Sequence, residues 1–279
     1  MNKLKLRAML EQYFLEDMGE RDISTELIFG KEEYGEISFI AKEDGIFCGE
    51  EIITVGFGLL SNQNRVELYV HDGNKIEKGQ ILARVTGNIS DLLSGERVIL
   101  NLVQRMSGVA TLTHNAVSKL NGTKTRICDT RKTTPGLRML EKYAVRIGGG
   151  YNHRYGLYDG VMIKDNHISF AGSITKAVVK VREQIGHMVK IEVETETLEQ
   201  VKEAIASGTD VIMFDNRTPE EIKAWIDLVP DSIITEASGG ITLENVASYG
   251  STGVDYISLG FLTHSAKAID ISVKVSITS

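Results

Sequence analysis

The chain lacks the long apolar runs of a membrane protein. None of its 279 residues belongs to an uninterrupted apolar run of 18. The first residues, Met1-Asn2-Lys3-Leu4-Lys5, open an amphipathic helical pattern without the apolar segment and cleavage site of a signal peptide. We therefore expect a cytoplasmic protein that has no membrane partner.

Cysteine is equally scarce. Cys48 and Cys128 are the two cysteines of the chain, and they stand far apart, without CxxC spacing or a Cys/His pattern. The sequence predicts two free, buried thiols, and neither a disulfide nor a zinc site.

The chain also lacks the net positive charge of a nucleic-acid-binding protein, since its formal charge is −7. The charge is unevenly distributed: residues 97–164 contain twelve Lys and Arg against three acids, a local balance of +9. This stretch has none of the interleaved aromatic residues that stack on single-stranded bases. We expect no nucleic-acid partner and predict a cationic cleft for a small, highly anionic ligand.

A change of periodicity divides the sequence. Residues 4–17 have the apolar spacing of a helix, whereas "EISFIAK", "RVELYVH" and "QILARVTG" alternate as strands do. After Ser94-Gly95-Glu96 we expect a long helix over 97–120. A hydrophobic content of 42% is enough for one large α/β domain and a smaller partner.

From residue 125 onward the chain has a βα rhythm. Six short apolar runs are the expected strands: "TRICDT" (125–130), "GVMIKD" (160–165), "VKIEVE" (189–194), "DVIMFD" (210–215), "SIITEA" (232–237) and "DYISLG" (255–260). Capping boxes at Thr197 and Thr218 predict two of the intervening helices. Parallel strands with helical crossovers at this repeat indicate an α/β barrel or an open parallel sheet.

Polar residues end all six predicted strands. Solvated loops place polar residues at some strand ends by chance, but here every end carries them, and the ends of parallel strands meet at one face. The residues are Arg131 and Lys132, Lys164 to Asn166, Glu192 and Glu194, Asp215 and Asn216, Glu236 with Ser238 to Gly240, and Ser258 with Gly260.

These ends differ in chemistry along the chain. The first two supply cations that suit carboxylates, Arg131 by a bidentate fork and lysine as a point charge. Glu194 and Asp215 would hold sugar hydroxyls or a hydrated Mg²⁺. The glycine turns "SGGIT" and "LGFLTHS" resemble phosphate-binding loops, although each alone is a weak signal. His264 could donate to a phosphate, and a helix cap explains it almost as well.

The segment "GGGYNHRYGL" (148–157) returns to the same face between the first two strands. We expect His153 and Arg154 to contact the ligand there.

The longest informative stretch is "DTRKTTPGLRMLEKYAVRIGGGYNHRYGLYDGVMIKDNHI". With "SGERVILNLVQRMSGVATLT", "IEVETETLEQ", "VIMFDN" and "EASGGITLENV", it resembles the quinolinate phosphoribosyltransferase family, also called nicotinate-nucleotide pyrophosphorylase (carboxylating). The resemblance covers most of residues 94–272.

The resemblance implies an incomplete, about seven-stranded α/β barrel (109–265) and an N-terminal α+β sandwich domain (1–108), with 266–279 packed back on the sandwich. It implies a reaction of quinolinate with 5-phosphoribosyl-1-pyrophosphate and Mg²⁺ that releases nicotinate mononucleotide, pyrophosphate and CO₂. It also implies a homodimer or higher homo-oligomer, in which Arg97 reaches the site of a neighbouring subunit.

The family's pattern assigns roles to individual residues. Arg131, His153, Arg154 and Lys164 would hold quinolinate. Lys132, Glu194 and Asp215 would be the catalytic groups, with the two acids facing the ribose and metal, directly or through water. Ser238, Gly239, Gly240, Gly260 and His264 would hold the 5-phosphate.

Two other functions fit parts of the pattern. A related barrel enzyme would act on nicotinate without loss of CO₂, but one carboxylate does not need so many cations. A non-catalytic anion-binding protein would have no reason to keep Glu194 and Asp215 among cations.

Overall fold

The structure is a computed structural model that describes residues 1–30, 33–120 and 122–277, and the chain forms two units in it. The first unit comprises Met1–Leu112, Met139–Gly148 and Ala266–Ser279; the second comprises Thr113–Arg138 and Gly149–Ser265. In this division residues 109–112 and 139–148, which the expected boundaries place in the barrel, lie in the first unit. Of the expected C-terminal segment, residues 278–279 lie outside the described part.

The first unit is built on an antiparallel sheet in the order β12-β1-β5-β3. Along β1, alternate residues are buried, among them Ile37, Phe39 and Ala41, so one face of the strand forms core. The pairing of β12 with β1 brings the end of the chain into this sheet. The strands of this unit are β1 (Tyr34–Ala41), β3 (Arg65–Leu68), β5 (Ile81–Asn88) and β12 (Ile271–Ile277), with the short pair β2 (Gly45–Ile46) and β4 (Lys75–Ile76).

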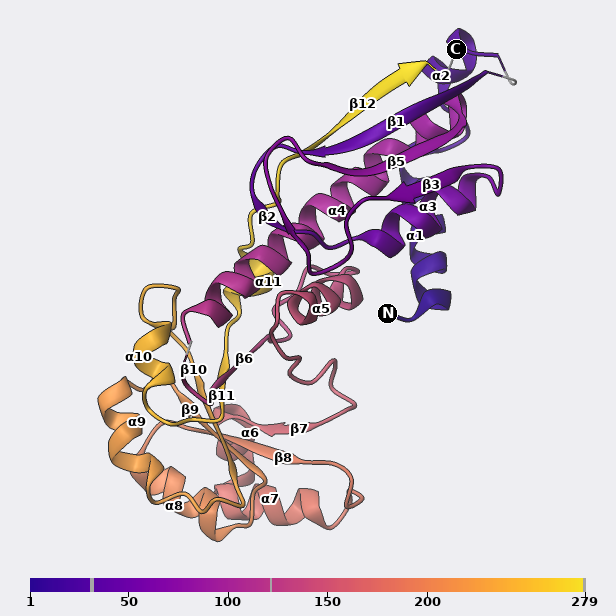
Figure 1. Ribbon diagram of the computed structural model, residues 1–279. Helices are drawn as coiled ribbons and strands as arrows, with labels where there is room; N and C mark the ends of the chain where they lie inside the picture. The colour runs from indigo at the N-terminus through magenta and orange to yellow at the C-terminus, as the bar shows by residue number, and fades with distance from the viewer. Residues whose placement is uncertain (31–32, 121, 278–279) are drawn as a thin grey trace. The chain divides into compact units, whose positions relative to one another are not determined.

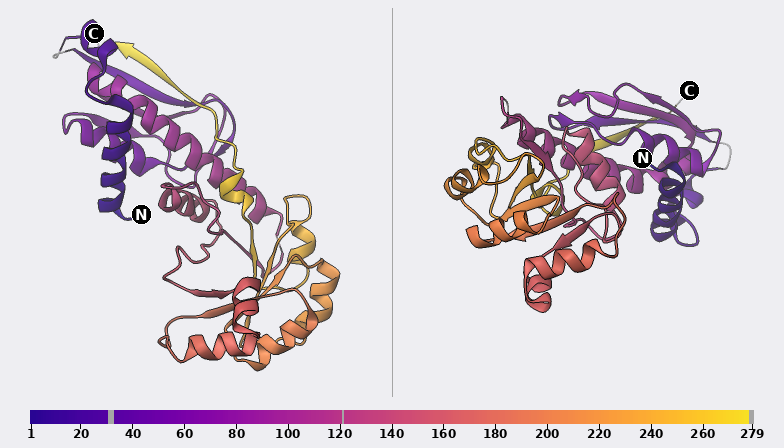
Figure 2. Two further views of the ribbon diagram at one scale, coloured as in Figure 1. Left: turned by 180° about the vertical axis from the view of Figure 1, so that it is seen from behind. Right: turned by 90° about the horizontal axis from the view of Figure 1, so that it is seen from below.

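A long helix, α4 (Ile89–Ser118), runs along this sheet (Figures 1 and 2). It begins eight residues before the predicted start, because Gly95 does not interrupt it. A Cβ at Gly95 would lie 2.4 Å from Leu60 Cδ1, so glycine there permits close packing against α3. The other helices of the unit are α1 (Lys3–Met18), α2 (Ile23–Ile28), α3 (Glu50–Leu60) and most of α5 (Arg138–Ile147).

Helix α5 belongs to the first unit because of polar contacts that sequence periodicity does not reveal. Arg105 Nη2 donates to Glu141 Oε1 at 2.7 Å, and the Glu141 side chain is fully buried. Arg105 Nη1 also donates to the Ala266 carbonyl at 2.7 Å. The Tyr143 hydroxyl donates to Asp72 at 2.7 Å.

The second unit contains a parallel sheet in the order β6-β11-β10-β9-β8-β7, which confirms the predicted incomplete α/β barrel. All six predicted strands are present. Tyr151 adds a single-residue parallel bridge to Cys128 on the free side of β6, the position of a seventh strand. The strands are β6 (Arg126–Cys128), β7 (Val161–Ile163), β8 (Ile191–Thr195), β9 (Val211–Asp215), β10 (Ile234–Ser238) and β11 (Tyr256–Ser258).

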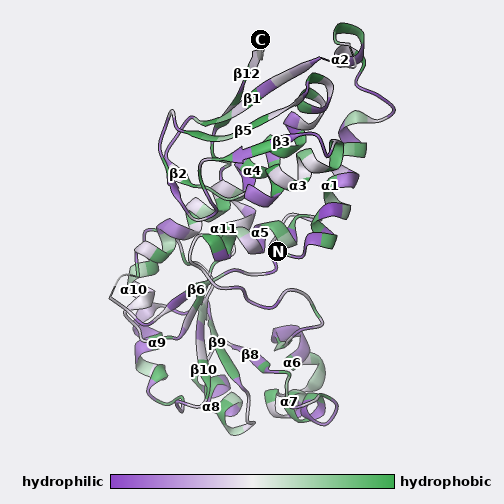
Figure 3. Ribbon diagram, turned by 45° about the vertical axis from the view of Figure 1, so that its right-hand side comes forward, coloured by the Kyte–Doolittle hydropathy of each residue, from purple (hydrophilic) through white to green (hydrophobic). Residues whose placement is uncertain are grey.

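Helices α7, α8 and α9 lie on the outer side of these strands (Figures 1 and 2). Both predicted capping boxes are present, at Thr197 with Gln200 and at Thr218 with Glu221. Figure 3 shows mostly hydrophobic colours on the central strands and mixed colours on the outer helices. The helices are α6 (Asp165–Ala171), α7 (Ile174–Arg182), α8 (Leu198–Ala206), α9 (Pro219–Ile226), α10 (Val246–Gly250) and α11 (Phe261–His264).

The sequence's other structural predictions concern cysteines and membrane spans. Cys48 and Cys128 are both buried, as predicted. Within the described residues, no helix combines the length and apolarity needed to cross a bilayer.

Replacing Arg105 tests how strongly α5 is held. Arg105→Ala leaves the buried Glu141 carboxylate without its guanidinium, so the free energy of unfolding should fall by about 3 kcal/mol, measured by urea denaturation. The control is Arg7→Ala, which breaks an exposed ion pair with Glu11 and should cost less than about 1 kcal/mol. Equal losses in the two variants would contradict the role given to Arg105.

Candidate active site

The ends of the barrel strands surround a cavity of about 580 Å³, as the parallel topology requires. Ten predicted site residues line it. They are Arg131, Lys132, His153, Arg154, Lys164, Glu194, Asp215, Ser238, Gly239 and Gly240. The predicted convergence of sequence-distant residues is therefore present in the structure.

A second cavity, of about 470 Å³, adjoins the first and shares Lys132, Gly239 and Gly240 with it. Gly260 and His264 line this second cavity. A Cβ at Gly260 would lie 2.9 Å from Lys132 Cδ and 3.3 Å from His264 Cδ2, so glycine leaves room for both side chains. The Thr263 hydroxyl donates to the Lys132 carbonyl at 2.7 Å and ties the two loops together.

Two arginines, Arg131 and Arg154, line the first cavity. Arg131 Nε is buried and has no hydrogen-bond partner among the described residues. Burial lowers the pKa of Arg154, and the nearby charge of Arg131 lowers it further. An anionic ligand would relieve this repulsion and use the orphan donor.

Lys164 is already paired, since its Nζ donates to Glu194 Oε1. Burial raises the pKa of Glu194, while the hydrogen bond and charge of Lys164 oppose that rise. Glu194 and Asp215 both line the cavity and offer carboxylate oxygens, the ligand atoms that Mg²⁺ prefers. These ligand atoms fit the predicted metal, whose binding stays a prediction.

Asn216 holds the Asp215 carboxylate. Its Nδ2 donates to Asp215 Oδ2 at 2.8 Å, and its backbone N–H donates to the Ser238 carbonyl at 2.8 Å. Asn216 adopts a left-handed backbone with φ of 53°, the one non-glycine residue with positive φ in the described chain. A Cβ on Gly239 would lie 2.2 Å from Asn216 Oδ1, so these two loops approach too closely for any other residue at 239.

The ring of His153 faces protein groups. Its Nδ1 accepts the Arg154 backbone N–H at 2.8 Å, and its Nε2 lies 3.0 Å from Glu192 Oε2. The predicted contact of His153 with a substrate carboxylate stays a prediction, and in this structure both ring nitrogens have partners within the protein.

Arg97 is the one predicted site residue in the first unit. It lies on α4 with its side chain 61% exposed, and its Nη2 is 3.6 Å from Glu96 Oε1. Its contribution to a neighbouring subunit's site stays a prediction.

Comparison with known proteins decides the family. The profile for the N-terminal domain of quinolinate phosphoribosyl transferase matches residues 22–107, and the profile for its C-terminal domain matches residues 109–274. The chain belongs to the quinolinate phosphoribosyl transferase family.

Members of this family resemble the whole chain. A probable nicotinate-nucleotide pyrophosphorylase (carboxylating) from Bacillus subtilis is 56% identical over 279 residues, covering 100% of this chain and 96% of the relative. Its counterpart from Synechocystis is 42% identical over 269 residues, 95% of this chain and 91% of the relative. The crystal structure of NadC from Streptococcus pyogenes has a TM-score of 0.96 at 37% identity, covering 100% of this chain and 99% of that one.

Three cavity residues of this quinolinate phosphoribosyl transferase family member were not predicted: Thr130, Met162 and Met213. Asn216 and Ser258 also line the cavity, and the sequence placed them at strand ends without giving them a role. The two methionines follow from strand alternation, since Met162 precedes Lys164 by two positions and Met213 precedes Asp215 by two. Asp165 and Asn166, although polar strand-end residues, do not line the cavity; they begin α6.

Two substitutions at Asn216 separate its backbone from its side chain. Asn216→Gly and Asn216→Ala both remove the amide that holds Asp215, so both should lower turnover to a similar extent. Of the two, only alanine is strained by a left-handed backbone. The free energy of unfolding of Asn216→Ala should therefore be about 1 kcal/mol lower than that of Asn216→Gly. Urea denaturation and steady-state kinetics measure both effects. Equal stabilities would show that the left-handed conformation is not required.

Proposed function

We propose that the chain transfers the phosphoribosyl group of 5-phosphoribosyl-1-pyrophosphate to quinolinate, with release of pyrophosphate and CO₂, and so makes nicotinate mononucleotide for NAD synthesis. The observation that carries this proposal is one cavity lined by Arg131, Arg154 and Lys164 together with Glu194 and Asp215. Quinolinate has two adjacent ring carboxylates, which match the excess of cations.

The cations of the cavity would bind and orient quinolinate. Arg131 has a buried Nε donor, and the guanidinium of Arg154 lies near the positive charge of Arg131. A substrate carboxylate would therefore interact favourably with both arginines. Lys164 would exchange or share its bond to Glu194 when the ligand enters. Orientation places the pyridine nitrogen against the ribose carbon that it attacks.

The second cavity and its rim would hold the phosphoribosyl donor. Lys132 lies between the two cavities and suits the phosphates as a point charge. Gly239, Gly240 and Gly260 bring backbone close to the 5-phosphate, and His264 lines the same space. Glu194 and Asp215 would hold Mg²⁺, which when bound neutralises charge on the pyrophosphate leaving group.

The bond changes need no protein nucleophile. As pyrophosphate leaves, the ribose carbon gains positive charge, which Glu194 and Asp215 stabilise, and the pyridine nitrogen bonds to it. The alkylated nitrogen is cationic, so when the adjacent carboxylate leaves as CO₂, the electron pair remains on the ring carbon beside that charge. This carbon then takes up a proton. A site closed to water favours these steps.

We also propose that the protein works in the cytoplasm as a homodimer or higher homo-oligomer. Arg97 supports a shared site, because its guanidinium is exposed and lies in the unit that does not contain the cavity.

The decisive experiment supplies quinolinate labelled in the 2-carboxyl group, together with 5-phosphoribosyl-1-pyrophosphate and Mg²⁺. We expect equal amounts of labelled CO₂ and nicotinate mononucleotide, and no turnover after chelation of Mg²⁺. Arg131→Ala should lower kcat/KM for quinolinate by about 10- to 100-fold, since hydrogen bonds to charged groups contribute about 1.5–3 kcal/mol. The exposed Lys180→Ala is the control. Turnover of nicotinate without CO₂, or binding without turnover, would overturn the proposal.

Mixing inactive variants tests the shared site. Arg97→Ala and Lys132→Ala should each be inactive alone. After subunit exchange, random dimers should recover about a quarter of the wild-type sites, because only a mixed dimer has one intact site. Activity of the mixture measures this recovery. No recovery, with exchange demonstrated by native mass spectrometry, would contradict it.

A further inference from the structure

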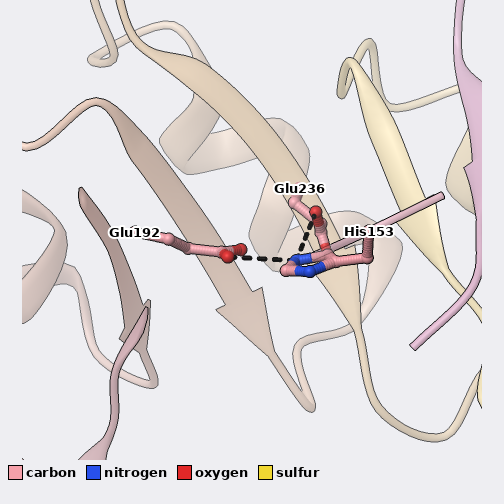
Figure 4. A group of neighbouring side chains, drawn as sticks. All are labelled: His153, Glu192 and Glu236. Atoms are coloured by element: carbon pink, nitrogen blue, oxygen red, sulfur yellow. Dashed lines mark ion pairs between the residues drawn. The ribbon is translucent and has the colours of Figure 1, made fainter. Parts of the chain in front are cut away.

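Three side chains form a buried cluster in the barrel: His153, Glu192 and Glu236 (Figure 4). The two acids come from β8 and β10, and the histidine comes from the segment after Tyr151. His153 Nε2 lies 3.0 Å from Glu192 Oε2 and 3.6 Å from Glu236 Oε2. The side chains of Glu192 and Glu236 are only 8% and 5% exposed.

Hydrogen bonding defines the tautomer of His153. The Arg154 backbone N–H donates to Nδ1 at 2.8 Å, so Nδ1 carries no proton. The imidazole is therefore neutral, with its proton on Nε2, the nitrogen that faces both acids. One N–H thus lies against two buried carboxyl groups.

Two buried carboxylates beside a neutral imidazole would repel each other strongly. Burial, and then the neighbouring charge of Glu192, raise the pKa of Glu236 to about 8. This raised pKa favours a proton on Glu236. Glu192 Oε2, at 3.0 Å, is the nearer acceptor for the histidine Nε2–H.

The same tautomer argues against a metal ion at this cluster, although its ligand atoms all lie within 4.8 Å of one another. A histidine that binds metal through Nε2 carries its proton on Nδ1, where it donates to a second group. In His153, a proton on Nδ1 would face the backbone N–H of Arg154, whose nitrogen lies 2.8 Å from Nδ1.

Asp129 holds the backbone of the segment that precedes Arg154. The backbone N–H of His153 donates to Asp129 Oδ1 at 2.8 Å, and the side-chain Nδ2 of Asn152 donates to Asp129 Oδ2 at 2.6 Å. Asp129 is fully buried. The segment before Arg154 is thus held on its backbone side by Asp129 and on its ring side by the two glutamates.

We propose that Glu192 and Glu236 are positioning residues: they hold His153 as the Nε2–H tautomer, whose Nδ1 accepts the Arg154 backbone N–H. This contact positions the residue whose guanidinium donates to the Gly160 carbonyl at 3.0 Å and lines the cavity proposed for quinolinate. The part of this inference that concerns quinolinate rests on the proposed function. Neither acid lines the main cavity, so both act through His153 and Arg154.

Paired substitutions test the two acids. Glu236→Gln has the shape of the neutral acid and should keep kcat/KM for quinolinate within about threefold of wild type. Glu192→Leu removes the acceptor of Nε2–H, so KM for quinolinate should rise by about tenfold or more, with a smaller change in kcat. Glu192→Gln restores an acceptor and should recover most of the loss. The control is Glu199→Gln, an exposed position on α8.

A readout independent of turnover is the ¹⁵N NMR spectrum of the histidine side chains, with His153 assigned by comparison with His153→Gln. Wild type and Glu236→Gln should show a fixed Nε2–H tautomer, and Glu192→Leu should lose it. A proton on Nδ1 in wild type, or loss of turnover in Glu236→Gln, would overturn the inference. If Glu192→Leu does not fold, as judged by circular dichroism, Glu192→Ala replaces it, and the same loss is expected because alanine also lacks an acceptor. Failure of wild type to turn over quinolinate would refute the proposed function alone, because the tautomer is measured without substrate.

Discussion

Repulsion among buried like charges is the constraint around which the second unit is organised. Arg131 and Arg154 lie close enough at one cavity for Arg131 to lower the pKa of Arg154, and an Arg131 donor is left without a partner in the described protein. Such an arrangement costs stability unless an anion completes it. At the rim of the barrel, Glu194 and other nearby acids oppose part of this repulsion, and the proposed ligand would supply further negative charge.

One level below the rim the neighbouring like charges are acids, and a protein side chain, not a ligand, lies against them. Glu192 and Glu236 are two residues before Glu194 and Ser238 on their strands, so they point to the same side one level deeper. There the Nε2 of His153 lies 3.0 Å from Glu192 Oε2 and 3.6 Å from Glu236 Oε2, and burial raises the pKa of Glu236. Rim and interior are linked through consecutive residues, because the histidine of the lower layer precedes the arginine of the upper one.

Glycine and asparagine set how closely the loops of the rim approach. Gly239 leaves room for the Asn216 amide, Gly260 leaves room for Lys132, and the left-handed Asn216 turns its side chain onto Asp215. The positions of the proposed catalytic groups therefore depend on residues that take no part in the proposed reaction. In the same way, Gly95 lies inside α4 and lets this helix pack on α3, whereas the predicted helix began at residue 97.

The sequence by itself determined the six barrel strands, and with them the convergence of Arg131, Lys164, Glu194 and Asp215, because parallel strands with helical crossovers send every carboxyl end to one face. It also sufficed for the family, through motifs that cover most of the chain. Only the tertiary structure decided that α5 joins the first unit, that Tyr151 replaces a seventh strand and that His153 faces two acids. These features depend on contacts between residues that are distant along the chain, such as Arg105 with Glu141, which no local periodicity encodes.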